Sequence, residues 1–431
     1  MTSTALLTDH YELTMVQAAL QSGAAGRRCV FEVFSRSLVG RRRYGVVAGL
    51  GRLVDDLPRF RYDADALEFL AATGVVDGAT CEWLSTYRFT GSIDGYAEGE
   101  AYFPGSPVLV VEGSFAECVV LETLILSVLN HDSAVATAAA RMVCAADGRP
   151  CIEMGSRRTH ERAAVASARA AYIAGFAASS NLAAGKKWGV PTTGTAAHAF
   201  TLAHDDEEAA FAAQVDALGR GTTLLVDTYD VEQGIRRAVK AAGPELGAIR
   251  LDSGDLLPLA HRARQLLDEL GATGTRIVVT SDLDENSIAR LGAAPVDGYG
   301  VGTSLVTGSG VPTAGFVYKL VARDTDDGWM PVQKTSTGKA STGGRKWAAR
   351  RHDAGGRAME EHVYIGGAPP PRDDERPLLV PVLRDGEPVH ATSLAEARQH
   401  CRRAIGDLPA DAMKLSPGDP ALDTRFEEVR P

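Results

Sequence analysis

The chain has 431 residues, of which 45% are apolar and 23% charged, and its formal net charge is -10 at pH 7. This composition is typical of a globular protein and excludes disordered, fibrous and membrane-embedded classes. The negative charge argues against a general nucleic-acid binder, because such proteins need clustered Lys and Arg to neutralise phosphates. The length exceeds one ordinary core and predicts a large barrel-type domain together with a smaller one.

The cysteines and the N-terminal residues predict the cellular compartment. Six cysteines are scattered without a C-x-x-C pair, which favours reduced thiols. Residues 1–15 lack a basic flank followed by an apolar segment, and no apolar run approaches the roughly 18 residues that a membrane span needs. The most apolar stretch, residues 118–129, is interrupted by Glu122 and is interpreted as a buried helix. We therefore expect a cytoplasmic protein with no membrane partner and no nucleic-acid partner.

The first hundred residues predict a separate α+β layer. Residues 8–20 have the pattern of a helix, and residues 35–45 form a basic loop. Glycines and prolines punctuate residues 91–113, which is typical of short strands.

From Cys151 onward, short β-rich segments alternate with helical patterns, which predicts parallel strands with helical crossovers. The predicted strands lie in residues 151–157, 190–195, 222–230, 248–255, 275–282 and 296–303. The predicted amphipathic helices are residues 161–184, 207–218, 231–242, 256–270 and 285–291. A barrel and an open doubly wound sheet both fit this pattern, but about six repeated units favour an irregular, incomplete βα barrel.

Polar side chains follow the predicted strands, and in parallel α/β folds the carboxyl ends of strands form the binding face. The segment DGYGVGTSLVTG places Gly302 and Thr303 after a strand, where backbone N–H groups can approach a phosphate. The alternative is an ordinary glycine-rich turn. The chain lacks the G-x-x-x-x-G-K-[ST] pattern, which argues against a P-loop fold.

The segment IRLDSGDLL brings Asp252 and Asp255 close together after a hydrophobic strand. Two carboxylates suit a hard cation or ribose hydroxyls, whereas the alternative is the N-cap of the next helix. Arg250 lies two residues before Asp252 and therefore shares its strand face, so that an anion could be fixed beside a ribose.

His198 follows the Gly/Thr-rich segment GVPTTGTAA. A single histidine is more often structural; a nucleophilic or phosphate-accepting role needs a carboxylate that fixes one ring nitrogen. Asp227 and Asp230, in LLVDTYD, are the two alternatives for that carboxylate.

Several basic residues could bind phosphate or could be solvated surface charges. Arg157 and Arg158 follow a strand end, and the guanidinium fork matches phosphate oxygens. For the three arginines of residues 41–43 the surface interpretation is favoured. Lys334 and Lys339, in KTSTGKASTGG, belong either to a flexible polar loop or to a phosphate site.

After Lys319 the alternation of helix and strand fades, and residues 394–405 predict a terminal helix. We expect an N-terminal α/β domain of residues 1–120, onto which residues 335–431 pack back. Residues 121–334 are expected to form the catalytic barrel.

An ordered series of motifs gives a resemblance to a known family. From Leu6 to about Gly344 the chain resembles nicotinate phosphoribosyltransferases; the series is LLTDHYELTM, FEVFSRS, RRYGVVAGL, EMGSRR, GTAAHAF, LVDTYD, IRLDSGDL, GYGVGTSLVT and YKLV. The resemblance implies a type II phosphoribosyltransferase fold, in which an N-terminal sandwich-like domain packs on an irregular α/β barrel. It also implies a head-to-tail homodimer with active sites shared between subunits.

The resemblance implies roles for individual residues. His198 would be phosphorylated by ATP and oriented by Asp227, and Tyr11 of the neighbouring chain would stack on the pyridine ring. Asp252 would bind the ribose or Mg²⁺. The other residues expected in the site are Asp255 for Mg²⁺, Gly302 and Thr303 for the 5′-phosphate, and Arg157, Thr195, Arg250, Ser253 and Gly254 for substrate.

The implied reaction joins nicotinate to the ribose of phosphoribosyl pyrophosphate, with ATP hydrolysis coupled through a phosphohistidine. Nicotinamide or quinolinate phosphoribosyl transfer is the alternative within the enzyme class, although quinolinate enzymes are typically much shorter. A catalytically silent, metabolite-binding regulatory protein is the alternative outside it.

Overall fold

The computed structural model describes residues 3–334, 341–389 and 392–429. The chain divides into two compact units, Met1–Thr137 with Val311–Pro431, and Ala138–Gly310. The first unit is α+β and the second contains a parallel half-barrel, so the predicted fold class is confirmed. The domain boundaries expected after residues 120 and 334 stay predictions.

The first unit is built on a seven-stranded sheet whose central strands come from both ends of the chain. β1 pairs with β12 on one side and with β5 on the other, antiparallel in both cases. In sheet order the strands are β13 (Gly328–Pro331), β12 (Phe316–Thr325), β1 (Arg28–Ser35), β5 (Leu109–Ser114), β3 (Ser92–Tyr96), β17 (Leu379–Arg384) and β18 (Glu387–Pro388). The strands expected in residues 91–113 are therefore present.

Two smaller sheets complete the strands of this unit. The four-stranded sheet has the order β16 (Glu375–Pro377), β14 (Lys346–His352), β15 (Ala358–Ile365) and β19 (Asp423–Glu428). A two-stranded ladder joins β2 (Gly45–Val46) to β4 (Ala101–Tyr102). No strand was predicted after residue 334, so the C-terminal strands β14, β15, β16 and β19 were missed.

Two helices of the first unit show ordinary capping signals at one end. The predicted N-terminal helix is α1 (His10–Ser22), which ends at Gly23 in the left-handed conformation that glycine favours. The predicted terminal helix is α15 (Leu394–Gly406), which begins with a capping box between Ser393 and Glu396. The others are α2 (Leu50–Asp56), α3 (Ala64–Thr73), α4 (Gly78–Ser85) and α5 (Phe115–Val119).

The apolar stretch around Glu122 is helical, as expected: α5 leads into α6 (Glu122–Ala145). Residues 115–145 form the single described helical run whose length and hydropathy would suffice to cross a membrane. Of its most apolar window, 67% is buried inside the protein, which is typical of a core helix.

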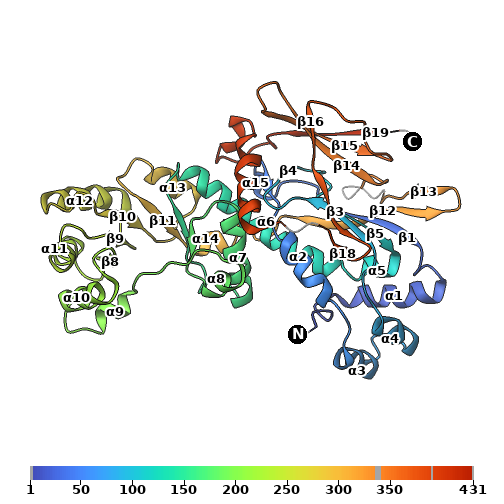
Figure 1. Ribbon diagram of the computed structural model, residues 1–431, viewed down its shortest axis with the longest axis horizontal. Helices are drawn as coiled ribbons and strands as arrows, with labels where there is room; N and C mark the ends of the chain where they lie inside the picture. The colour runs from blue at the N-terminus through green and yellow to red at the C-terminus, as the bar shows by residue number, and fades with distance from the viewer. Residues whose placement is uncertain (1–2, 335–340, 390–391, 430–431) are drawn as a thin grey trace. The chain divides into compact units, whose positions relative to one another are not determined.

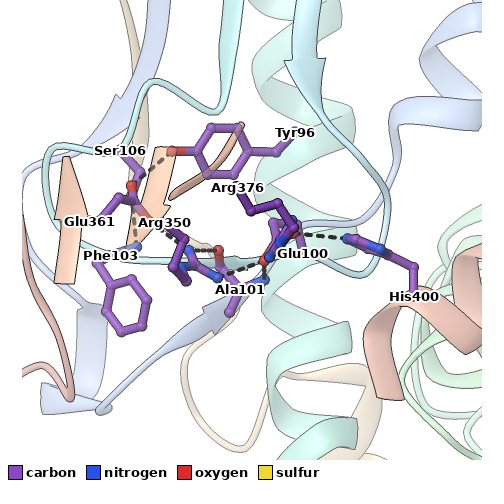
Figure 2. A network of polar contacts seen from close by, with 9 residues as sticks. All are labelled: Tyr96, Glu100, Ala101, Phe103, Ser106, Arg350, Glu361, Arg376 and His400. Atoms are coloured by element: carbon purple, nitrogen blue, oxygen red, sulfur yellow. Dashed lines mark hydrogen bonds and ion pairs between the residues drawn. The ribbon is translucent and has the colours of Figure 1, made fainter. Parts of the chain in front are cut away.

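A buried polar network ties the C-terminal strands to the N-terminal ones within the first unit (Figure 2). The guanidinium of Arg350, on β14, donates to Glu100 and Glu361 at 2.6 Å each. Glu100 also pairs with Arg376 at 2.8 Å and with His400 at 2.9 Å. Because the network joins residues about 250 positions apart in sequence, it fixes these strands to one another.

The second unit contains a six-stranded sheet in which every pairing is parallel. In order its strands are β7 (Ala178–Ser179), β6 (Cys151–Glu153), β11 (Gly298–Val301), β10 (Arg276–Val279), β9 (Ala248–Leu251) and β8 (Thr223–Leu225). Ile249, Ile277 and Tyr299 are fully buried in it. The sheet curls into a half-barrel that begins at β7 and ends at β8.

Amphipathic helices cover this sheet, and α10, α11 and α12 pack side by side (Figure 1). Four predicted helices are confirmed: α10 (Glu207–Leu218), α11 (Val231–Ala242), α12 (Leu256–Glu269) and α13 (Glu285–Leu291). The remaining helices are α7 (Glu161–Ile173), α8 (Leu182–Trp188), α9 (His198–Leu202) and α14 (Thr303–Val306).

Two sequence predictions in this unit are wrong. The expected helix 161–184 stops at Ile173, because Gly175 adopts a positive φ of 113° that a helix cannot continue through. Strand β7 then occupies residues that were predicted helical. The expected strand 190–195 is reduced to one isolated bridge between Ser179 and Thr192.

Candidate active site

A pocket of about 440 Å³ lies within the second unit at the carboxyl ends of its parallel strands. Its wall is made by the segments that follow β6, β7, β9, β10 and β11, and by residues 193–198. Parallel strands place their carboxyl ends at one edge, which explains why motifs distant in sequence meet here. Of the predicted site residues, the pocket brings together Arg157, Thr195, His198, Arg250, Asp252, Gly302 and Thr303.

His198 is the first residue of α9, and its ring is held by a neighbouring hydroxyl. Nδ1 lies 3.2 Å from the Thr228 hydroxyl oxygen. Nε2 lies 3.8 Å from one oxygen each of Asp227 and Asp252, which is longer than a hydrogen bond. With its side chain 38% exposed, His198 can be reached from the pocket.

Asp227 is almost completely buried, and its position is fixed by the strand next to its own. One of its oxygens accepts hydrogen bonds from the backbone N–H of Asp252, at 2.9 Å, and from the Ser253 hydroxyl, at 2.7 Å. Asp230, the alternative partner for the histidine, instead caps α11 by accepting from the backbone of Gln233. The assignment of Asp227 as the orienting residue stays a prediction.

Arg250, on β9, is oriented by the segment that leads to His198. Its Nη1 donates to the Thr195 hydroxyl at 2.7 Å and to the Ala196 carbonyl at 3.1 Å. The nearest oxygen of Asp252 is 3.7 Å from Nη2. Burial lowers the pKa of Arg250, and the attraction of Asp252 only partly opposes this. The guanidinium is therefore buried without a close carboxylate partner.

Asp252 presents a partly exposed carboxylate to the pocket. The hydroxyl of Thr280, at the end of the next strand, donates to one of its oxygens. The following residue, Ser281, also lines the pocket and has a φ of 142°, a conformation that residues other than glycine rarely adopt. Such strain is typical of functional sites.

Arg157, Arg158, Gly302 and Thr303 form the part of the pocket best suited to phosphate. Gly302 precedes α14, and a Cβ there would come within 3.5 Å of the Met154 backbone oxygen. The backbone N–H groups that begin α14 and the two exposed guanidinium groups supply the donors that a phosphate needs.

Ser253, Gly254 and Asp255 are exposed and are not among the described residues that line the pocket. Asp255 is the residue before α12, but its side chain makes no capping hydrogen bond. Tyr11 lies on α1 of the first unit, where its side chain is 44% exposed. Ser253, Gly254 and Asp255 are therefore not part of the described pocket lining, and the role expected for Tyr11 stays a prediction.

The other basic segments lie in the first unit or beyond the described residues. Arg41 is exposed, and the backbone of residues 41–43 bonds to Gly418 and Ala421. Lys334 is described and exposed, whereas Lys339 lies outside the described residues.

Several residues in or beside the pocket were not predicted as site residues. Thr228, which contacts His198, and Thr280, which contacts Asp252, are neighbours of residues that were singled out. The available signal for both was their position near the end of a predicted strand. Ser180 also lines the pocket, but it was hidden because β7 was predicted to be helical. Asp282 lines the pocket at the end of a predicted strand, where polar side chains were expected.

The donor set of the pocket fits Mg²⁺, because Asp252 and Asp282 provide the hard oxygen ligands that this ion prefers. Among the described residues, no cluster of three or more His, Cys, Asp or Glu side chains is arranged to hold a metal. Mg²⁺ usually binds through one or two carboxylates together with substrate phosphates, and a sparse protein site is consistent with that mode.

Comparison with known proteins gives matches along nearly the whole chain. The family model of the nicotinate phosphoribosyltransferase N-terminal domain matches residues 6–130. A nicotinate phosphoribosyltransferase of Mycobacterium tuberculosis is 63% identical, over 97% of this chain and 94% of the relative. The Bacillus subtilis nicotinate phosphoribosyltransferase is 38% identical, over 80% and 72%. The crystal structure of human nicotinic acid phosphoribosyltransferase matches with a TM-score of 0.84 at 27% identity, over 98% of this chain and 97% of that one.

Proposed function

The chain belongs to the nicotinate phosphoribosyltransferase family, and we propose that its pocket transfers the phosphoribosyl group of phosphoribosyl pyrophosphate to nicotinate. The products are nicotinate mononucleotide and pyrophosphate, and the reaction serves NAD salvage in the cytoplasm. The observation that carries the proposal is the convergence of His198, Arg250 and Asp252 in one pocket whose lining also includes Arg157, Arg158, Gly302 and Thr303.

In the transfer, the pyridine nitrogen attacks C1 of the ribose while the bond from C1 to the pyrophosphate oxygen breaks. Pyrophosphate leaves with the electron pair, and the ribose passes through a cationic state like that of glycoside chemistry. Asp252 is suited to hold the ribose hydroxyls, and Gly302 and Thr303 to hold the 5′-phosphate. The work of the protein is mainly positioning and electrostatic stabilisation.

Mg²⁺ would be held by Asp252 and by the phosphates of the substrate. When bound, it neutralises charge on the leaving pyrophosphate. Arg157 and Arg158, which also line the pocket, would add fixed positive charge. Asp255, outside the pocket lining, stays a predicted second ligand.

ATP is a second substrate in the proposal. A ring nitrogen of His198 attacks the γ-phosphorus, ADP leaves, and water later releases the phosphoryl group as phosphate. This role is supported by the exposure of the ring and by the Thr228 contact, which leaves Nε2 facing two carboxylates instead of a hydrogen-bond partner. Phosphorylation adds negative charge beside Asp227 and Asp252, and we infer that the resulting repulsion rearranges the neighbouring loops around the substrates.

The test is a substrate panel of nicotinate, nicotinamide and quinolinate with phosphoribosyl pyrophosphate, measured with and without ATP. The wild type should release pyrophosphate with nicotinate and hydrolyse ATP. His198→Ala should lose ATP hydrolysis and acid-labile phosphate incorporation, while a slow ATP-independent transfer persists. Transfer to quinolinate or nicotinamide in place of nicotinate would contradict the proposal and favour one of those two transferase activities. No transfer at all would favour a regulatory protein without catalytic activity. Wild-type labelling of the variant from γ-phosphate would reject His198 alone.

We also propose a homodimer in which Tyr11 of one subunit stacks on the pyridine ring in the pocket of the other. The exposure of Tyr11 on α1, far in sequence from the pocket residues, supports this arrangement. Mixing inactive Tyr11→Ala and His198→Ala chains should then restore part of the activity. A protein that is fully active as a monomer would contradict the proposal.

A further inference from the structure

Glu153 is a buried carboxyl group that directly precedes Met154, a residue of the pocket lining. It is the last residue of β6, a strand that lies between β7 and β11 in the parallel sheet. Its side chain is fully buried, with 0% exposed. The mechanism proposed above does not use it.

The two carboxyl oxygens of Glu153 hold two different turns. Oε1 accepts a hydrogen bond from the backbone N–H of Gly155, in the turn that follows β6. Oε2 accepts one from the hydroxyl of Ser179, the last residue of β7. The backbone oxygen of Glu153 accepts a third, from Ser180 N–H at 2.8 Å. One residue therefore fixes both strand ends relative to each other.

The link continues through Asn181. Its backbone N–H donates to the Ser179 hydroxyl oxygen at 2.8 Å, and its side-chain amide donates to the Ser156 hydroxyl at 3.0 Å. The result is a closed ring of contacts from Glu153 through Ser179 and Asn181 to Ser156. Arg157 and Arg158 come directly after Ser156 and line the pocket.

The charge environment of Glu153 is unusual for a residue with only a packing role. Burial raises the pKa of its carboxyl, and the bonds from Ser179 and Gly155 only partly offset this. Among the described residues it forms no ion pair with Lys, Arg or His. An apolar side chain would fill the same space without the desolvation cost, but it could not accept from both donors.

We propose that Glu153 is a positioning residue that sets the two arginines after β6 at the geometry needed for the pyrophosphate group of the substrate. The proposal rests on the function given above, since it names the residue that shapes the phosphate side of that site. Without the carboxylate, the Gly155 N–H and the Ser179 hydroxyl lose their common acceptor. The turn that carries Arg157 and Arg158 is then free to move away from the phosphates.

The experiment measures the binding of inorganic pyrophosphate with Mg²⁺ to the full chain by calorimetric titration, together with KM for phosphoribosyl pyrophosphate and for nicotinate. Glu153→Gln keeps the shape of the side chain, but its amide N–H₂ group cannot accept a hydrogen bond. It would therefore face the Gly155 N–H or the Ser179 hydroxyl, each of which donates to Glu153. Ser179→Ala removes only the second contact. Glu161→Gln, at an exposed side chain on α7, is the matched control.

We expect pyrophosphate affinity and KM for phosphoribosyl pyrophosphate to worsen roughly tenfold in Glu153→Gln, as the loss of one charged hydrogen bond implies. KM for nicotinate should change by less than about twofold, because the loss of one charged hydrogen bond would change it by more and none is lost on the nicotinate side. Ser179→Ala should show part of the same effect, and the double variant should be no worse than Glu153→Gln, because both changes break one link. The Glu161→Gln control should behave like the wild type.

A purely structural role predicts a lower melting temperature with unchanged pyrophosphate affinity, and that result would overturn the proposal. If Glu153→Gln does not fold, an unchanged affinity in Ser179→Ala overturns it instead. Pyrophosphate binding needs no turnover, so it can be measured even if the protein does not use nicotinate. If the wild type does not use nicotinate but the variants still bind pyrophosphate more weakly, only the proposed function is rejected. Unchanged binding by variants of an active transferase would reject only the positioning role.

Discussion

The guanidinium group of Arg350 in the first unit is fully buried and that of Arg250 in the second is largely buried, and the two differ in what surrounds them. Arg350 makes 2.6 Å contacts to two carboxylates, Glu100 and Glu361 (Figure 2). Arg250 bonds to a hydroxyl and a carbonyl, and its nearest carboxylate is 3.7 Å away. Burial alone would lower the pKa of both; the carboxylates reverse this for Arg350, whereas the pKa of Arg250 stays lowered.

The difference separates a structural charge from a binding charge. The carboxylates around Arg350 satisfy its charge inside the protein. Its removal would take the arginine from the buried Glu361 and leave Glu100 with Arg376 and His400. Arg250 keeps an incompletely balanced charge at the pocket wall, where an incoming anion can approach it. Three substitutions test the two sides of this comparison.

The largest effect is expected for Arg350→Ala. Removing one partner of a buried ion pair typically costs about 3–5 kcal/mol, because the remaining charges are left uncompensated. The free energy of unfolding, measured by urea denaturation, should fall by that amount. Arg351→Ala is the matched control. Its partner Glu360, 2.9 Å away, keeps His362 and Arg425 as partners, and the arginine side chain is 39% exposed, so the loss should be only about 0–1 kcal/mol. Equal losses in the two variants would contradict the structural role of Arg350.

The next effect concerns substrate selectivity in Arg250→Gln. Nicotinate carries a carboxylate where nicotinamide carries a neutral amide, and a charged hydrogen bond contributes about 1.5–3 kcal/mol, or roughly ten- to a hundredfold. The variant should raise KM for nicotinate much more than KM for phosphoribosyl pyrophosphate, and should narrow the preference over nicotinamide. Steady-state kinetics with both pyridines measure this.

The competing role for Arg250 is to clamp pyrophosphate. In that case both KM values would rise alike and the ratio of acid to amide would stay the same. Arg276→Gln, at the exposed first residue of β10, controls for loss of an arginine elsewhere in the same sheet.

The smallest expected effect is on the acid stability of the buried network. Burial alone would raise the pKa of Glu100, but Arg350, His400 and Arg376 outweigh burial and lower it. A lowered pKa stabilises the fold above the usual pKa of glutamate, about 4.3, and this contribution is lost as the pH falls toward the lowered value. Below about pH 4 the unfolding free energy should therefore fall by up to about 1.4 kcal/mol per pH unit because of Glu100.

Glu100→Gln isolates this contribution. The variant should be less stable at pH 7 and should show a shallower loss of stability between about pH 4 and pH 3, read from urea titrations. Identical slopes for the wild type and the variant would show that Glu100 is not held ionised by its partners.

The sequence predicted those parts of the fold that have a repeating local pattern. Helices α10, α11 and α13 begin and end at the predicted residues, because a local helical pattern between turn signals can be recognised without tertiary information. The position of Arg250 and Asp252 at the pocket was predictable as well, since they lie on and directly after β9 of the parallel sheet. His198 also lines the pocket, although the strand expected before it is only one isolated bridge.

Tertiary contacts decided what the sequence could not predict. Strand β7 has only two residues, in a run of small residues that suits a helix equally well, and it forms because β6 offers it a parallel edge. Strand β14 has the sequence KWAARRH, and its charged residues suggest exposure to solvent. The sequence alone does not reveal that Glu100 and Glu361 pair with Arg350 inside the protein. The contact between His198 and Thr228 likewise depends on a crossover whose geometry no local pattern reveals.

The open side of the half-barrel has a consequence for how the chain tolerates changes in length. Between β7 and β8 the chain, described throughout, runs through α8, α9 and α10 with a single isolated bridge at Thr192. Inserting residues between α9 and α10 shifts no strand register, and lengthening a surface loop costs little, about 0.6 kcal/mol for each doubling. The segment that carries His198 can therefore gain or lose residues during evolution while the six paired strands keep their alignment.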